Sequence, residues 1–262
     1  MNPQKDAKNR TILPEERRRI ILDTLKRDGK VLSSELALEL ATSEDTVRRD
    51  LKELEDAGLL QRVHGGALPQ TPVPHEYKER SRRDTIAKEA IGKAAATLVG
   101  PTDTVLLDGG TTILQVARAL PPSFRGTVIT SNLNAVLALA EHPEADVIVL
   151  GGKLHKPILG CIGSQVANEI AKVQADICFM GATSLDPTSG LASLDYEEAH
   201  IKRAMVAASS RVVAVLSSEK LGTASPFLFA SMEELDYLVT GKSAPAEVVE
   251  QCRLLGVEVL QG

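Results

Sequence analysis

Apolar residues in the first third of the chain recur at the spacing of an α-helix. Ile20, Ile21, Thr24 and Leu25 form one such stripe, and they follow Pro14, a residue that favours the first turn of a helix. We therefore expect the chain to begin its ordered structure with a helix near Pro14 and to leave residues 1–13 as a flexible N-terminus.

Two more helices are expected downstream, each behind a serine that can accept a hydrogen bond from the first turn. Ser33 or Ser34 would cap the first of them, and Ser43 would cap the second, which should cover residues 44–57 and end at Gly58. A short helix, a tight turn and a longer helix in this order are typical of a helix-turn-helix.

The last of these helices has two chemically different sides, because successive residues turn by ~100°. One side is apolar and carries Val47, Leu51 and Leu54. The other side carries Arg48, Arg49 and Lys52. Such a face is either simply solvated or enters the major groove of DNA, where arginine pairs with guanine.

The segment after this helix strengthens the DNA-binding interpretation and leaves the solvated face as an equal alternative. Residues 59–63 read as a strand and residues 64–66 as a tight turn, a hairpin that would rest as a wing on the DNA backbone. Hydroxyl groups near the helix N-terminus would bind phosphate. The expected DNA-contacting residues are Ser43, Thr46, Arg48, Arg49, Lys52, Arg62, His64 and Gly65.

A stretch of Pro-Gln-Thr-Pro-Val-Pro begins at residue 69 and resists helix formation. It divides the chain into a DNA-binding domain (14–68), a linker (69–76) and an α/β domain (77–262). The linker and residues 77–99 are the segments expected to couple the two domains.

Apolar runs alternate with helical segments from residue 104 onward. Strands are expected at 104–108, 128–130, 147–150, 176–180, 212–216, 237–240 and 257–260. Helices are expected at 112–120, 133–141, 164–172, 196–208 and 246–255. Strands that are apolar throughout and separated by helices indicate a mostly parallel sheet covered on both faces, an α/β fold.

The loops at the carboxyl ends of the first three strands are rich in Gly, Ser and Thr. Their residues are Asp108, Gly109, Gly110, Thr111 and Thr112; Thr130, Ser131 and Asn132; and Gly151, Gly152 and Lys153. Each loop alone fits ordinary turn chemistry. Together, at one edge of a sheet and beside helix N-termini, they suggest a pocket for a phosphate or a polyol.

Two charged motifs add to this expectation. Glu198 and Lys202 lie one helical turn apart, which fits either a surface ion pair or a place in the pocket. Lys220 follows a strand end, where it is either a solvated loop residue or the cation that neutralises a ligand phosphate.

Charge and composition narrow the classes of function. Residues 1–83 carry 17 Lys/Arg against 15 Asp/Glu, and the remainder carries 13 against 20, so the first third is the part suited to a phosphate backbone. Aromatic residues make up 3% of the chain, which argues against stacking on nucleobases.

No metal, cofactor or membrane segment is expected. Cys161, Cys178 and Cys252 show neither a CxxC pair nor metal-ligand spacing with the histidines. Unpaired cysteines and the absence of a secretion signal or a long apolar run indicate a cytoplasmic protein.

The motif Ser43-Glu-Asp-Thr-Val-Arg-Arg-Asp-Leu51, followed by Gly58-Leu-Leu-Gln-Arg-Val-His-Gly-Gly-Ala67, resembles the N-terminal domain of the DeoR family of bacterial regulators. Residues 76–241 resemble its sensor domain through the segments 108–112, 176–181, 198–205 and 219–222. The resemblance implies a winged helix-turn-helix with residues 44–57 as recognition helix, in which we expect Asp50 to orient Arg48, Arg49 or a backbone group.

For the second domain the resemblance implies a fold shared with ribose-5-phosphate isomerase and coenzyme A transferases, used to sense a phosphorylated sugar that releases a repressor from operator DNA. The chain departs from the family pattern at Gly109, where serine is common, and at Ser217, where aspartate is common. The implied partners are double-stranded operator DNA, a sugar-phosphate effector and further copies of the chain in a homodimer or homotetramer.

Two other functions remain open at this stage. The chain could be a sugar-phosphate isomerase or transferase-like enzyme with an accessory DNA-binding domain, with Asp108 and Glu198 as the acid–base candidates. It could also be a nucleic-acid-binding scaffold whose second domain only oligomerises. We expect a regulator without catalytic residues.

Overall fold

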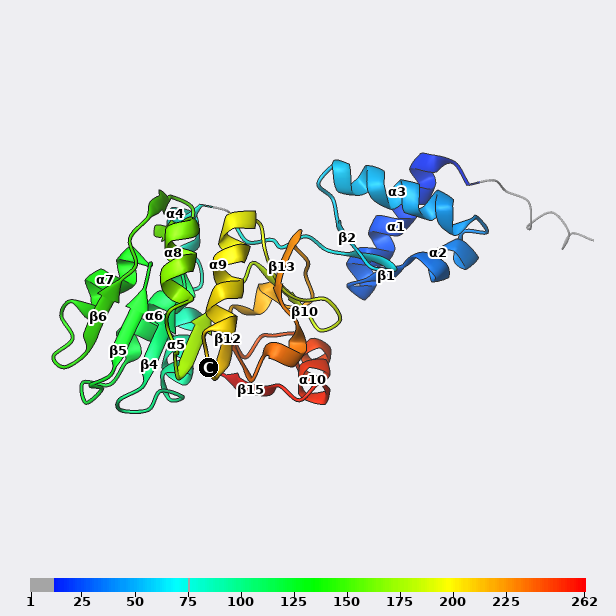
Figure 1. The fold of residues 1–262 in the computed structure, drawn as a ribbon. Helices are drawn as coiled ribbons and strands as arrows, with labels where there is room; N and C mark the ends of the chain where they lie inside the picture. Colours follow the sequence, from blue (N-terminus) through cyan, green and yellow to red (C-terminus); the bar gives the residue numbers. More distant parts are fainter. Residues whose placement is uncertain (1–11, 75) are drawn as a thin grey trace, which may run out of the picture. The chain divides into compact units, whose positions relative to one another are not determined.

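The computed structural model describes residues 12–74 and 76–262. The chain divides into two compact units, Met1–Gln70 and Thr71–Gly262 (Figure 1). The predicted flexible segment 1–13 lies almost wholly outside the described residues.

The first unit packs three helices against a small antiparallel sheet. The helices are α1 (Pro14–Asp28), α2 (Ser33–Glu39) and α3 (Glu44–Asp56). The strands are β1 (Val31–Leu32), β2 (Gln61–Val63) and β3 (Gly66–Leu68), in the order β1-β3-β2. The predicted apolar stripes meet in one core, and the predicted winged helix-turn-helix is confirmed.

Local sequence explains where the helices of this unit start and stop. Gly29 ends α1 in the left-handed region, at φ 71°. Ser43 caps α3, because its hydroxyl oxygen accepts a hydrogen bond from the Thr46 backbone N–H at 3.2 Å. The prediction that Ser33 or Ser34 caps α2 is wrong: Leu32 occupies the cap position without a side-chain hydrogen bond, because the chain enters α2 directly from β1.

Gly66 allows the wing to close on β1. A Cβ atom at this position would lie 1.9 Å from the backbone oxygen of Val31, a distance that no side chain can occupy. The Gly65-Gly66 pair therefore serves the close pairing of β3 with β1 as well as the turn.

A seven-stranded sheet forms the centre of the second unit. Its strands are arranged in the order β15-β14-β12-β9-β4-β5-β6. Its strands are β4 (Thr104–Leu107), β5 (Thr127–Thr130), β6 (Asp146–Val149), β9 (Ile177–Met180), β12 (Val212–Leu216), β14 (Tyr237–Thr240) and β15 (Glu258–Gln261). Every neighbouring pair is parallel, which confirms the predicted α/β class.

Helices cover both faces of this sheet (Figure 1). One face packs against α5 (Thr85–Ala96), α6 (Thr111–Ala119) and α7 (Leu133–Leu139). The other packs against α8 (Ser164–Ile170), α9 (Tyr196–Ala207) and α10 (Ala246–Leu254). Because both faces are buried, the strands are apolar at successive positions rather than at alternate ones.

Several short elements were not predicted. They are α4 (Tyr77–Arg80), the hairpin of β7 (Lys153–His155) with β8 (Gly160–Ile162), and a small antiparallel sheet of β10 (Ser184–Asp186), β11 (Gly190–Ser193) and β13 (Phe227–Ala230). Single 3₁₀ turns lie at Ser218–Lys220 and Met232–Glu234. These segments are too short for a helical or alternating pattern to reveal them.

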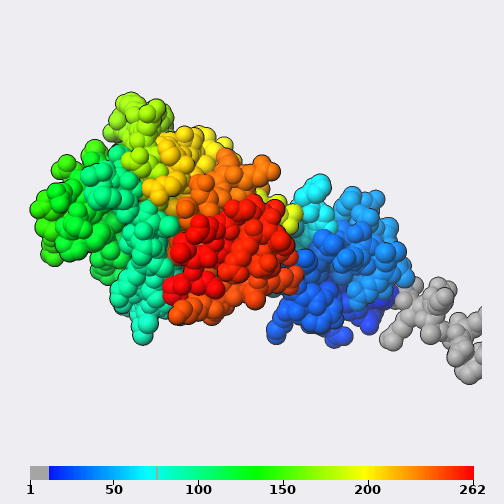
Figure 2. Space-filling model, turned by 90° about the horizontal axis from the view of Figure 1, so that it is seen from below, coloured from blue at the N-terminus to red at the C-terminus, as the bar shows by residue number. Residues whose placement is uncertain are grey.

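The C-terminal strand lies beside α5, more than 160 positions away in sequence. Figure 2 shows the red C-terminal segment against the blue-green one, and a Cβ atom at Gly262 would lie 2.4 Å from the backbone oxygen of Ala90. Among the described helices, none is long and apolar enough to cross a bilayer.

The role expected for Asp50 is wrong. Asp50 does not orient Arg48 or Arg49; it is buried inside the first unit and forms an ion pair with Arg17 of α1, whose Nη2 donates to Asp50 Oδ1 at 3.0 Å. A carboxylate removed from water needs such a partner, so this pair fixes α3 against α1.

Replacing Asp50 with alanine should lower the free energy of unfolding of the first unit by about 1–3 kcal/mol, because the half-buried Arg17 guanidinium loses its hydrogen-bonded anion. Urea unfolding of the full chain, followed by circular dichroism, measures this. Asp56→Ala, an exposed position on the same helix, is the matched control and should change little. Equal effects of the two substitutions would contradict the structural role of the pair.

Candidate functional site

The chain changes direction across the large sheet between β4 and β9. From β4 it proceeds outward to β5 and β6, and then returns to β9 on the other side of β4 before proceeding to β12 and β14. The segments that follow β4 and β9 therefore diverge to opposite faces, and they leave a crevice at the carboxyl ends of the two strands. Open parallel sheets bind ligands at such a point.

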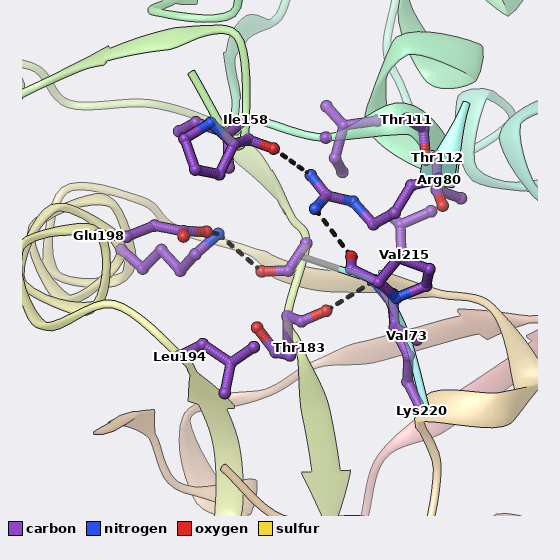
Figure 3. Close-up of a pocket in the computed structure, with 18 residues that line it drawn as sticks. Val73, Arg80, Thr111, Thr112, Ile158, Thr183, Leu194, Glu198, Val215 and Lys220 are labelled. Atoms are coloured by element: carbon purple, nitrogen blue, oxygen red, sulfur yellow. Dashed lines mark hydrogen bonds and ion pairs between the residues drawn. The ribbon is translucent and has the colours of Figure 1, made fainter. Parts of the chain in front are cut away.

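A pocket that is open to solvent lies at this crevice (Figure 3). Its lining comes from the loop after β4, the loop after β9, helix α9 and the end of β12, joined by residues before α5 and from the β7–β8 hairpin. The lining residues are Val73, Pro74, Arg80, Gly109, Gly110, Thr111, Thr112, Ile113, Pro157, Ile158, Gly181, Ala182, Thr183, Leu194, Glu198, Lys202, Val215 and Lys220.

One wall of the pocket is the N-terminus of α6. Gly110 precedes the helix with φ 120°, a conformation that side chains disfavour, and Thr111 and Thr112 form its first turn. Backbone N–H groups of a first turn have no partner within the helix, and the helix dipole gives that end partial positive charge. This wall is suited to an anion.

Lys202 lies at the base of the pocket and is 1% exposed. Its ammonium forms ion pairs with Asp108 and, at 3.1 Å, with Glu198 Oε1, and it donates to the Gly181 oxygen at 2.9 Å. Burial opposes the charge on Lys202, but the attraction of Asp108 and Glu198 outweighs it and raises the pKa of Lys202. Glu198 and Lys202 are therefore not a surface pair.

Lys220 carries the second ammonium group of the pocket, and its surroundings differ from those of Lys202. It donates to the backbone oxygen of Ala182 at 2.7 Å, from the 3₁₀ turn after β12. Burial, followed by repulsion from Arg80, lowers the pKa of Lys220 to about 8. An anion in the pocket would offset both effects.

Arg80, at the end of α4, crosses the pocket (Figure 3). Its Nη2 donates to the Pro157 oxygen at 2.6 Å and its Nη1 to the Pro74 oxygen at 3.2 Å. Burial lowers the pKa of Arg80, and Glu198 opposes that shift.

The three predicted loops do not form one pocket. Of their residues, Gly109, Gly110, Thr111 and Thr112 line it, and Asp108 lies behind it on Lys202. The second loop is used for structure: Thr130 donates to the Leu107 oxygen at 2.7 Å, and Asn132 caps α7. Ser131 lies under the β7–β8 hairpin, because its backbone oxygen accepts from Cys161 N at 3.0 Å.

The third loop is also outside the pocket. Gly151, Gly152 and Lys153 are exposed and lead into β7, at the far edge of the sheet. The loops after β5 and β6 lie on the same side of the change in direction, so no crevice opens between them.

The basic side of α3 is exposed as predicted. Arg48, Arg49 and Lys52 all reach solvent. Arg48 pairs with Glu44 at 3.0 Å, but its side chain is 62% exposed, so the pair is weak and exchangeable. Ser43 and Thr46 lie at the helix N-terminus, where their hydroxyl oxygens are 2.9 Å apart.

The wing places its polar residues at its tip and on one strand. His64 and Gly65 form the exposed turn between β2 and β3. Arg62 of β2 pairs with Glu55 of α3 at 2.9 Å and thereby joins the wing to the helix.

Comparison with known proteins follows the same division of the chain. A family model for the DeoR-like helix-turn-helix domain matches residues 17–72, and a model for the DeoR C-terminal sensor domain matches residues 83–242. An HTH-type transcriptional regulator, GlpR of Haloferax volcanii, is 35% identical over 96% of this chain and 99% of its own length. The glycerol-3-phosphate regulon repressor of Escherichia coli K12 is 31% identical over 88% of this chain and 92% of its own.

The chain belongs to the DeoR family. It is a DNA-binding transcription regulator with a sensor domain. Ribose 5-phosphate isomerase A of Methanocaldococcus jannaschii resembles it with a TM-score of 0.39 and 17% identity, over 53% of this chain and 55% of that one. That likeness is too slight to support an inference about activity.

Sequence reasoning missed several parts of this pocket. Among them are Val73 and Pro74, Arg80, residues 181–183 and the hairpin residues Pro157 and Ile158. Arg80 lies between the ranges that the two family models match, in the segment 77–99 that was expected only to couple the two domains. Gly181, which directly follows the predicted strand 176–180, was the sequence signal that could have indicated residues 181–183 as part of the pocket.

Within the described residues of this regulator, no three His, Cys, Asp or Glu side chains are grouped so that they could hold a metal ion. The three cysteines are buried and unpaired, and burial raises the pKa of Cys178 to about 12.

Proposed function

We propose that this chain is a repressor that binds operator DNA through α3 and the β2–β3 wing, and that a phosphorylated sugar in the pocket releases it. The observation that carries the proposal is the pocket itself, in which a helix N-terminus and the cations Lys220 and Arg80 surround one opening. A phosphate group matches such a set, and the names of relatives such as the glycerol-3-phosphate regulon repressor agree with it.

The proposed site has an anion end and a polyol end. The anion end comprises Gly109, Gly110, Thr111, Thr112, Arg80 and Lys220. The polyol end comprises Thr183 and Glu198, whose oxygen atoms can accept hydrogen bonds from sugar hydroxyl groups. Lys202 is already paired with Asp108 and Glu198, so its role is to hold the carboxylates in place.

The proposed DNA-contacting residues are Ser43, Thr46, Arg48, Arg49, Lys52, Arg62, His64 and Gly65. A single copy presents one recognition helix, and winged helix-turn-helix regulators read operators with two-fold symmetry as dimers. We therefore include a homodimer or homotetramer, acting in the cytoplasm, in the proposal.

Arg48→Ala and Arg49→Ala should each weaken operator binding by about 1–3 kcal/mol if the side chain pairs with guanine. The operator is obtained by selecting duplexes from a random pool with the wild-type protein, and fluorescence anisotropy gives the affinities. Lys172→Ala removes an exposed cation from the second unit and serves as control. Unchanged affinity of both arginine variants would remove α3 from the interface.

Effector binding is tested with glycerol 3-phosphate, ribose 5-phosphate, fructose 1-phosphate and glucose 6-phosphate, each beside its unphosphorylated counterpart. A ligand that binds the folded state at 100 times its Kd should stabilise it by about 2.7 kcal/mol, which thermal unfolding detects, and it should dissociate the operator complex. A scaffold would respond to none of them. Turnover at ordinary enzyme rates would favour the isomerase or transferase alternative.

Affinity for the phosphorylated ligand should fall by about tenfold per pH unit above the Lys220 pKa of about 8. Above that pH the free ammonium has lost its proton, and each binding event must take one up. Titration calorimetry between about pH 7 and pH 9.5, where the phosphate is a dianion, measures this. Lys220→Arg keeps its charge and should flatten the profile. A flat wild-type profile would exclude Lys220 from the anion site.

A further inference from the structure

The segment that leads out of the DNA-binding unit is itself part of the pocket wall. The second unit begins at Thr71, and Val73 and Pro74 already line the pocket together with Arg80. The sequence analysis interprets this segment as a linker. Because Val73 and Pro74 line the pocket, a ligand bound there would contact the segment. The effector site and the covalent connection to the DNA-binding unit therefore share residues.

Arg80 is fixed at its backbone while its side chain spans the opening. The buried Lys88 donates to the backbone oxygens of Arg80 and Arg83, each at 2.6 Å, and so holds the end of α4. From that anchored position the Arg80 guanidinium reaches the Pro74 oxygen on one side and the Pro157 oxygen on the other. The side chain thus ties residue 74 to the β7–β8 hairpin.

These two bonds go to neutral acceptors, although the guanidinium is charged. Arg80 also lies close enough to Lys220 to repel it, and Glu198 and Glu76 are the carboxylates that act on Arg80. A phosphate dianion between Arg80 and Lys220 would be a stronger acceptor than a carbonyl oxygen, because it carries the opposite charge and pairs with a guanidinium in a bidentate way.

We propose that Arg80 couples the pocket to the DNA-binding unit: a bound phosphate takes the Arg80 guanidinium away from the carbonyl oxygens of Pro74 and Pro157 and releases the segment Thr71–Pro74. The inference rests on the proposed function, and it adds the residue through which the ligand acts. A ligand shifts an equilibrium only by its differential affinity for two states, and Arg80 supplies a contact that differs between them.

The first test uses the wild-type chain with the member of the sugar-phosphate panel that binds. Hydrogen–deuterium exchange of peptides covering residues 71–80 should become at least several-fold faster when the ligand is bound, while peptides from β4 and β9 become slower or stay unchanged. If the 71–80 peptides exchange at the same rate as in the free protein, or more slowly, at ligand saturation, the proposal is overturned. This test needs no variant.

The second test measures coupling, defined as the ratio of operator Kd with and without saturating ligand. In Arg80→Gln the ratio should collapse toward one, since the contact that distinguishes the two states is gone. Arg80→Lys keeps the charge but loses the forked donors, and it should give an intermediate ratio. Arg82→Gln is the matched control, an exposed arginine two positions away that does not line the pocket, and it should keep the wild-type ratio.

The two proposals fail in different ways. If no panel member binds the wild-type chain or changes its operator affinity, the proposed function fails. If the wild type responds, and Arg80→Gln and Arg80→Lys, with ligand occupancy verified by calorimetry, respond with the wild-type ratio, then the effector function stands and the role of Arg80 is overturned.

Discussion

Strands β4 and β9 are hydrogen-bonded neighbours, yet the chain leaves them toward opposite faces of the sheet, into α6 on one side and toward α9 on the other. A parallel sheet permits this divergence at a change of strand order. Everything in the pocket depends on it, because the divergence exposes the N-terminus of α6 and lets Lys202 of α9 reach Asp108 at the end of β4. The charges of the site are arranged around an opening that topology creates.

In both units an ion pair that contains a buried side chain holds helices in place. Arg17 and Asp50 join α1 to α3 in the first, and Lys202 joins α9 to the β4 and β9 ends in the second. A buried charge without its partner costs several kcal/mol, so each pair permits one arrangement of its helices and disfavours others. The exposed pairs, such as Arg48 with Glu44, leave their side chains available for a ligand.

Periodicity predicted the helices and the strands of the large sheet nearly to the residue, because burial on one helical face or on both sheet faces leaves a direct pattern in the sequence. It could not predict strand order, and so it grouped the loops after β4, β5 and β6 into one pocket. Of these loops, the structure places only the first beside the opening. Arg80 and the partner of Asp50 depend on contacts between distant segments, which no local pattern records.

The pocket wall formed by Val73, Pro74 and Arg80 has a consequence for recombination among such regulators. A chimera that joins the DNA-binding head of one relative to the sensor of another inherits a working cavity only if the junction precedes Thr71, where the second unit begins. A junction at the start of the matched sensor range, residue 83, would graft a foreign wall onto the cavity. A junction at Gln70 keeps this wall intact, because Thr71 and the residues after it stay with the sensor.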